Sequence, residues 1–99
     1  MNALERLAER LGAEVYLEIA GWHLYLRDVR TPPLARELAT SLAPFLKTQQ
    51  LPDLAQLLSG IPVPVGGGKG EVTLWQCLPA ASVRALEELV AEYARGWPD

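Results

Sequence analysis

The chain is poor in the residues from which small proteins build disulfides and metal centres. Its 99 residues include one cysteine, Cys77, and one histidine, His23. A single cysteine cannot form an internal disulfide, and one cysteine with one histidine cannot supply the four ligands of a Cys/His zinc site. We therefore expect no metal site and a reducing, cytoplasmic location.

Cationic surface and long apolar runs are also missing. Nine Lys and Arg residues against twelve Asp and Glu residues give a net charge of −3, and no block of one sign stands out. Because nonspecific nucleic-acid binding needs a cationic surface that releases counterions, we expect no nucleic-acid partner. No run of about 18 apolar residues could cross a bilayer, so no transmembrane segment is expected. Residues 1–11 alternate leucine with charge, unlike a signal peptide.

The apolar content is sufficient for one core. Hydrophobic residues make up 49% of the chain and charged residues 21%. A chain of about 100 residues buries roughly two-thirds of its unfolded surface, which supports one independently stable domain. The sequence therefore predicts a single domain over residues 1–99 and disfavours large multi-substrate enzymes.

Helical periodicity appears first near the N-terminus. Apolar residues at i, i+3, i+4 and i+7 predict a short amphipathic helix, with Asn2 as its N-cap and Gly12 as the residue that ends it. The next helix is predicted to start at Thr31-Pro32-Pro33, with the threonine as N-cap. Pro44 is expected to kink or end that helix, because its ring clashes with the preceding turn.

Two further helices are predicted in the second half of the chain. One covers 51–59, carries Leu51 on its apolar side and is capped by Gly60. The last begins at Pro79 and ends at Gly96, with an apolar stripe facing the core.

The apolar residues of the segment 14–29 fit both the period of a helix, 3.6 residues, and that of a strand, 2 residues. Val15, Ile19, Trp22, Leu26 and Val29 have helical spacing, but the same segment also alternates like two strands joined at Ala20-Gly21. Because alanine is unfavourable at the first position of a type I′ turn, the helix is the favoured interpretation and the hairpin the alternative. Such a helix would be apolar almost all round and would lie centrally in the core.

A β-hairpin is predicted before the last helix. In Ile61-Pro62-Val63-Pro64-Val65, prolines alternate with β-branched residues, which is typical of an extended edge segment. A glycine-rich tip, residues 66–70, separates it from residues 71–75, which have high β propensity. The sequence thus predicts a mainly α (α+β) fold of about five helices around one core, with a short two-stranded β-hairpin before the C-terminal helix.

The hairpin supplies the candidate binding residues. Consecutive glycines followed by lysine can form an anion-binding nest, but a phosphate loop also needs Ser or Thr after the lysine and a following helix, and both are missing. An exposed tip that meets another macromolecule is the preferred interpretation, with tryptophan as its anchor. The predicted partner-binding residues are Gly66, Gly67, Gly68, Lys69 and Trp75.

No catalytic residue is predicted. His23 is the one side chain that ordinarily titrates near neutral pH, but without a recognisable partner it is expected to be packed, hydrogen-bonded and structural. Cys77 is expected to be a small buried residue rather than a nucleophile. The acidic residues Glu87, Glu88 and Glu92 are expected to form a solvated helix face, and no cofactor is expected.

Six short segments distributed over nearly the whole chain form a recognisable set: Val15-Tyr16-Leu17, Trp22-His23-Leu24-Tyr25-Leu26, Ile61-Pro62-Val63, Gly66-Gly67-Gly68-Lys69, Glu71-Val72 and Leu78-Pro79. Together they resemble a family of small uncharacterised cyanobacterial proteins, a domain of unknown function. The resemblance implies a host and a compartment, but no reaction, ligand or catalytic residue.

These observations lead to one functional expectation with two rivals. We expect a non-enzymatic protein-interaction or assembly and regulatory factor of unknown pathway, which binds a protein partner through the hairpin around Gly66–Trp75 and a helix face. A small-ligand or anion-binding protein that uses the glycine-rich hairpin tip is the alternative, and an enzyme built on His23 is the third hypothesis. Homo-oligomerisation stays open.

Overall fold

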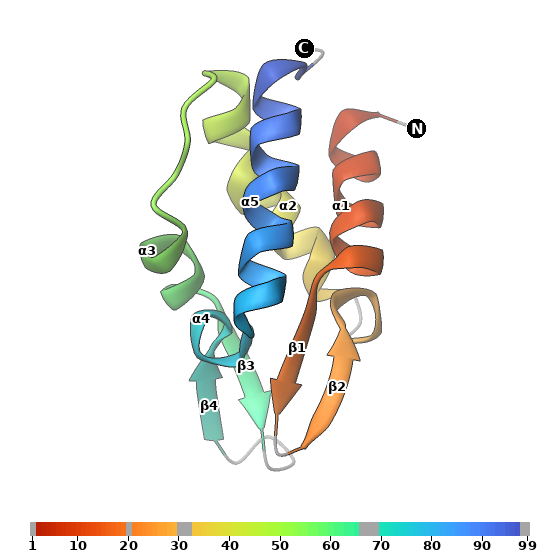
Figure 1. Ribbon diagram of the computed structural model, residues 1–99, viewed down its shortest axis with the longest axis vertical. Coiled ribbons are helices and arrows are strands. Elements are labelled where there is room, and N and C mark those ends of the chain that lie inside the picture. The colour runs from red at the N-terminus through yellow and green to blue at the C-terminus, as the bar shows by residue number, and fades with distance from the viewer. Residues whose placement is uncertain (1, 20, 30–32, 66–69, 98–99) are drawn as a thin grey trace.

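The three longest helices lie side by side at one end of the molecule and two β-hairpins lie at the other (Figure 1). A computed structural model describes residues 2–19, 21–29, 33–65 and 70–97, with backbone alone at 64 and 65. The elements in these residues are α1 (Ala3–Glu14), β1 (Tyr16–Ile19), β2 (Trp22–Tyr25), a 3-10 turn η1 (Leu26–Asp28), α2 (Leu34–Lys47), α3 (Leu54–Ser59), β3 (Pro62–Val65), β4 (Gly70–Thr73), α4 (Leu74–Cys77) and α5 (Ala80–Arg95).

The predicted mainly α architecture is confirmed, including the hairpin before the last helix. The identity of the five helices differs from the prediction, because one expected helix is a hairpin and α4 was expected to be strand. The core is dominated by leucines and joins the long helices to both hairpins. Its fully buried large side chains are Leu7, Leu11, Leu17, Leu26, Leu34, Leu38, Leu42, Leu46, Leu58, Leu74, Leu86 and Leu89.

Helix α1 has the predicted start but not the predicted end. Asn2 Oδ1 accepts the backbone N–H of Glu5 (2.8 Å), and the Glu5 carboxylate accepts the N–H of Asn2 (3.3 Å), which completes a capping box. The prediction that Gly12 ends the helix was wrong, because the helix continues to Glu14. Gly12 is instead buried against η1, where a Cβ would lie 2.8 Å from the Cβ of Arg27. Its missing side chain permits this close approach.

The helix predicted over residues 14–29 was wrong, and the alternative hairpin is the observed structure. Strands β1 and β2 pair antiparallel, with Ile19 opposite Trp22 beside the turn. Gly21 has a φ of 85°, a left-handed conformation that glycine adopts without strain. The hairpin packs one face on the core through Leu17 and exposes Trp22, which the helical interpretation had placed centrally.

The hairpin predicted before the last helix is confirmed for its strands. Residue 62 pairs with 73 and residue 65 with 70. The glycine-rich tip at residues 66–69 lies outside the described residues. Trp75 was expected in the second strand but lies in α4, because Thr73 ends β4 and caps a helix. Thr73 Oγ1 accepts the N–H of Gln76 (3.2 Å), and Gln76 Oε1 accepts the N–H of Thr73 (2.9 Å).

The second helix, α2, passes through Pro44 and ends at Lys47, so the expected termination at that proline does not occur. The predicted threonine N-cap was wrong, because α2 begins at Leu34 and the cap position is Pro33, which offers no side-chain hydrogen bond; Thr31 itself lies outside the described residues. Gln49 then adopts a φ of 58°, and Gln50 N–H reaches back to the Phe45 carbonyl (2.8 Å). This is the hydrogen bond of a Schellman motif, which turns the chain away from the helix.

Helix α3 begins three residues later than predicted. Asp53 caps it by accepting the N–H of Gln56 (3.3 Å), so Leu51 and Pro52 precede the helix. Gly60 is its C-cap, as predicted, in a right-handed conformation. Helix α5 follows Pro79 and ends at Gly96, also as predicted. Within the described ranges, no helix is both long and apolar enough to span a membrane.

Candidate functional site

An apolar hollow lies between α5 and the segment that leads into α3. One wall is formed by residues 51–55 and by Trp75 of α4, and the other by Val83, Val90 and Ala91 of α5. Its volume is about 440 Å³. Figure 1 shows why these elements meet: α3 and α4 both lie on the same side of α5, away from α1.

Two further hollows extend this one along the helix. Beyond Trp75, the lining continues over Leu78 and Ala80, and it shares Val83 with the first hollow. In the other direction it continues over Ala94, and shares Leu51 and Ala91. We call the three together the α5 groove. Because α5 rises about 1.5 Å per residue, the groove follows roughly 22 Å of helix.

Two large hydrophobic side chains stand at the rim of the α5 groove. Leu51 is 70% exposed and Trp75 is 38% exposed. Leu51 projects because Pro52 disfavours helical backbone at the preceding residue and Asp53 starts the helix only afterwards. Trp75 projects because the Thr73 cap turns the chain into α4. Exposed apolar side chains beside an apolar hollow are characteristic of a docking surface.

Charged side chains divide the α5 groove into three zones. Arg84 lies at the end nearest the start of α5, Asp53 and Glu87 line the middle, and Arg95 lies at the far end. All four residues are exposed. The groove therefore has an acidic middle between two basic ends.

Of the predicted partner-binding residues, the structure places Trp75 at the α5 groove. Gly66, Gly67, Gly68 and Lys69 lie outside the described residues, so binding at the glycine-rich tip stays a prediction, for anions as for proteins. Leu51 is the groove residue that sequence reasoning missed, because it was assigned to a buried helix face. The Leu-Pro-Asp order at residues 51–53 was the available signal.

His23 lies on the surface of the first hairpin rather than in the core. Its ring stacks on Tyr16 at 3.9 Å between centroids and meets Tyr25 at 5.9 Å. The expected packed, hydrogen-bonded histidine is thus packed on one side by Tyr16, but the residue is exposed to solvent. A structural rather than catalytic role stays a prediction. Tyr25, opposite Tyr16, belongs to the same aromatic surface at the end of the hairpin away from the turn. Trp22, 69% exposed, lies beside the turn opposite Ile19, on the other face of the hairpin.

Cys77 is buried, as predicted. Burial removes water from the sulfur and raises the pKa of the Cys77 thiol, which disfavours the nucleophilic thiolate. Glu87 and Glu88 are solvated as expected, while Glu92 pairs with Arg10 of α1. Among the described residues, no group of three or more His, Cys, Asp or Glu side chains could hold a metal ion.

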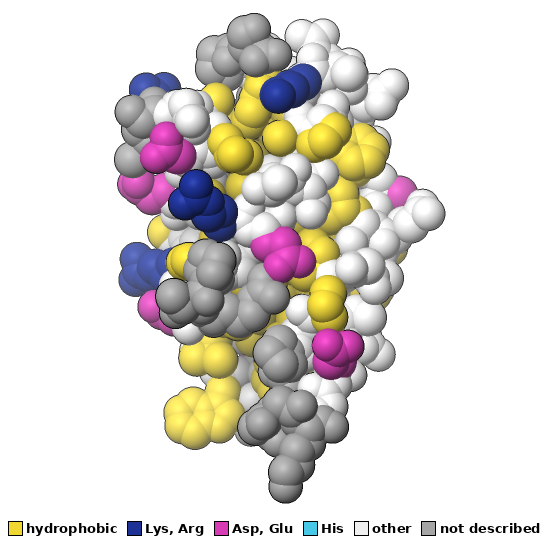
Figure 2. All heavy atoms as spheres, turned by 180° about the vertical axis from the view of Figure 1, so that it is seen from behind, with side chains coloured by type: hydrophobic (Ala, Val, Ile, Leu, Met, Phe, Trp, Pro, Cys, Tyr) yellow, Lys and Arg dark blue, Asp and Glu magenta, His cyan; other side chains and the backbone are white. Residues whose placement is uncertain are grey.

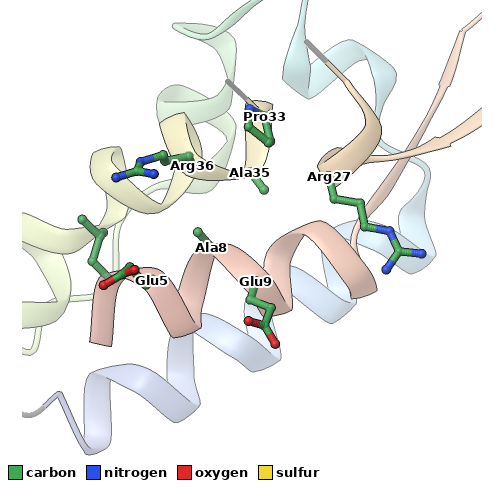
Figure 3. A pocket seen from close by; sticks show the side chains of 8 residues that line it. Glu5, Ala8, Glu9, Arg27, Pro33, Ala35 and Arg36 are labelled. Carbon is green, nitrogen blue, oxygen red and sulfur yellow. The ribbon is translucent and has the colours of Figure 1, made fainter. Parts of the chain in front are cut away.

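A smaller cleft of about 300 Å³ lies between α1 and α2. Figure 3 shows Ala8 and Ala35 facing each other across it, while the side chains of Arg27 and Glu9 extend away. The charged residues Glu5 and Arg36 also line the cleft, but both are exposed, and the Glu5 carboxylate already accepts the Asn2 N–H. On the far face of the molecule, Figure 2 shows hydrophobic patches interspersed with charges of both signs. We therefore take the α5 groove as the candidate site.

Comparison with known proteins gives a family and one relative. The relative is the Thylakoid-associated protein slr0729 of Synechocystis sp. (strain ATCC 27184 / PCC 6803 / Kazusa), which is 29% identical over 92 residues, covering 91% of this chain and 88% of the relative. No solved structure matches. The model of a protein family of unknown function, DUF3181, matches residues 4–93. Since this match takes in nearly every element from α1 to α5, the chain belongs to the DUF3181 family.

Proposed function

We propose that the protein is a non-enzymatic interaction or assembly factor that binds a protein partner in the α5 groove. The observation that carries this proposal is the pairing of a hollowed apolar surface with two exposed anchors, Leu51 and Trp75. Aromatic residues in such surroundings contribute a large share of binding energy at protein interfaces. The buried Cys77 thiol and the aromatic stacking of His23 support a binding role over catalysis.

The first test is in-cell photo-crosslinking. A benzophenone amino acid in place of Ala55, on the groove wall, is expected to link the protein to a discrete partner in a cyanobacterial host. The same probe at Thr40, exposed on α2 and outside the groove, is the control and is expected to give no such product.

Trp75→Ala is expected to lower the yield of the crosslink from position 55 at least about tenfold, because truncation removes a central aromatic anchor. Circular dichroism should show the same helix content, since the side chain lies at the surface. Equal crosslinking from Thr40, or a yield that Trp75→Ala leaves unchanged, would contradict the proposal.

We also propose that the protein works at the thylakoid membrane, on its cytoplasmic side. The support is the printed name of the relative together with Trp22, which is exposed beside the turn of the first hairpin. Tryptophan favours the boundary between lipid and water, because its ring is apolar and its N–H is polar. Glu18 and Glu71 are exposed on the two hairpins, so an uncharged lipid surface suits this end better than an anionic one.

Trp22→Ala is therefore expected to reduce binding to phosphatidylcholine vesicles about tenfold, the effect of withdrawing one large apolar side chain from the interface. Co-sedimentation with the vesicles measures it. Trp75→Ala is the control and should bind vesicles as the wild type does. If Trp22→Ala and wild type sediment equally, membrane contact through this hairpin is excluded.

A further inference from the structure

We infer that the occupant of the α5 groove is an amphipathic helix of the partner protein, with a basic residue beside the middle of its apolar stripe and acidic residues near both ends. This rests on the proposed function and adds the chemistry of the partner. It is carried by the shape of the groove and by the order of charges along it.

The shape of the groove suits a helix. Its walls come from α5, α3, α4 and the residues between them, and no described strand lines it, so an added strand would find no sheet edge to pair with. Ala80, Ala91 and Ala94 lie on one face of α5 and are small enough for another helix to pack closely. Leu51 and Trp75 lie beside this face, where their side chains can pack against the apolar side of the docked helix.

The charges of the groove specify the partner's polar residues. Asp53 and Glu87 line the middle, whereas Arg84 and Arg95 lie toward the two ends. A partner helix with a lysine or arginine beside its central apolar residue meets the acidic zone. An acidic residue about one turn away on one side meets Arg84, and another about two turns away on the other side meets Arg95. Opposite charges at the rim of an interface select the partner and speed its association.

The same order of charges disfavours a second copy of this chain as the occupant. A twofold dimer uses the same patch from both copies. When the centres of the two grooves are opposed, a second α5 brings an acidic middle to an acidic middle in either direction, with Glu87 among its central charges. Like charges placed together across an interface oppose association.

The test is a selection with the purified full-length protein. The probe is a phage-displayed library of 18-residue, alanine-based helices with leucine at i, i+4, i+7 and i+11. The flanking positions vary among Lys, Glu and Gln. Selection on the wild type is expected to enrich lysine at the varied positions beside the two inner leucines and glutamate at those beside the two outer leucines. Selection on Glu87→Lys is expected to enrich glutamate instead of lysine beside the inner leucines.

Affinities of the best wild-type peptide provide the quantitative check. Fluorescence anisotropy should show Kd at least about tenfold weaker for Glu87→Lys and for Trp75→Ala. The matched control is Glu88→Lys, the same charge change at an exposed neighbour outside the groove lining, which should change Kd less than about twofold. Sedimentation should show the wild type as a monomer.

Four results would overturn the inference: no enriched helix, a central preference that is the same in Glu87→Lys, equal effects of Glu87→Lys and Glu88→Lys, or a dimer that Trp75→Ala dissociates. The last result would assign the groove to a second copy. None of them removes the proposed function, which fails separately if the probe at position 55 crosslinks no partner in cells.

Discussion

Replacing Leu17 by alanine is expected to lower the free energy of unfolding by about 2–5 kcal/mol, the range for deleting a buried leucine side chain. Leu17 is fully buried and is the residue through which β1 enters the core. Small domains are stable by only about 5–15 kcal/mol, so this loss is a large fraction of the total. Urea unfolding followed by far-ultraviolet circular dichroism measures it.

The matched control is Leu24→Ala on the paired strand. Leu24 lies directly opposite Leu17 but is only half buried, so the same truncation should cost less than about half as much. Equal losses at the two positions would contradict the observed packing of the hairpin, in which Leu17 is fully buried and Leu24 packs only partly against the core.

Gly12→Ala is expected to destabilise the protein by about 1–3 kcal/mol, the usual range for overpacking. In an ordinary helix interior the same change stabilises by about 1 kcal/mol, so the sign is informative. The new Cβ would lie 2.8 Å from the Cβ of Arg27 and 3.3 Å from its backbone N and Cα, atoms that cannot rotate away. Thermal and urea unfolding would both report the loss.

Gly60→Ala serves as the control for Gly12→Ala. Its added Cβ would lie 3.4 Å from the carbonyl oxygen of Leu57, an ordinary contact, and the backbone is right-handed. The change in stability should therefore stay within about 0.5 kcal/mol. A stabilised Gly12→Ala protein would show that α1 and η1 do not pack as closely as described.

The long helices could be predicted from the sequence because their apolar residues repeat over several turns. Helices α1, α2 and α5 each present a stripe to the core, and the Asn2 capping box is readable from spacing alone. Gly12 was misread because its neighbour Arg27 comes from a distant segment. The local sequence does not distinguish a glycine that ends a helix from a glycine whose missing side chain lets another segment of the chain pack closely against the helix.

For the first hairpin, the repeat of apolar residues could not decide between a helix and two strands. Each strand has four residues, too few to separate a period of 2 from one of 3.6. The hairpin is supported by tertiary contacts that the sequence does not display, such as the Tyr16 N–H donated to Ser82 Oγ of α5 (3.2 Å).

Part of the candidate site could be predicted. Trp75 was predicted to bind a partner, and the structure places it at the α5 groove, although in α4 rather than in a strand, because the capping box of Thr73 and Gln76 was not recognised. The α5 groove itself could not be predicted. It forms where α3, α4 and α5 meet, and its apolar residues on α5 resemble the edge of an ordinary core stripe.

The contacts that α5 makes with the start of the chain have a consequence for biosynthesis. Arg10 pairs with Glu92, and Tyr16 bonds to Ser82, across separations of 82 and 66 residues. The ribosome releases the N-terminal half first, so α1 and the first hairpin emerge long before the helix that covers them. The domain therefore completes its fold only after α5 has left the ribosome. Because α5 also forms one wall of the α5 groove, a chain that ends before α5 lacks this surface.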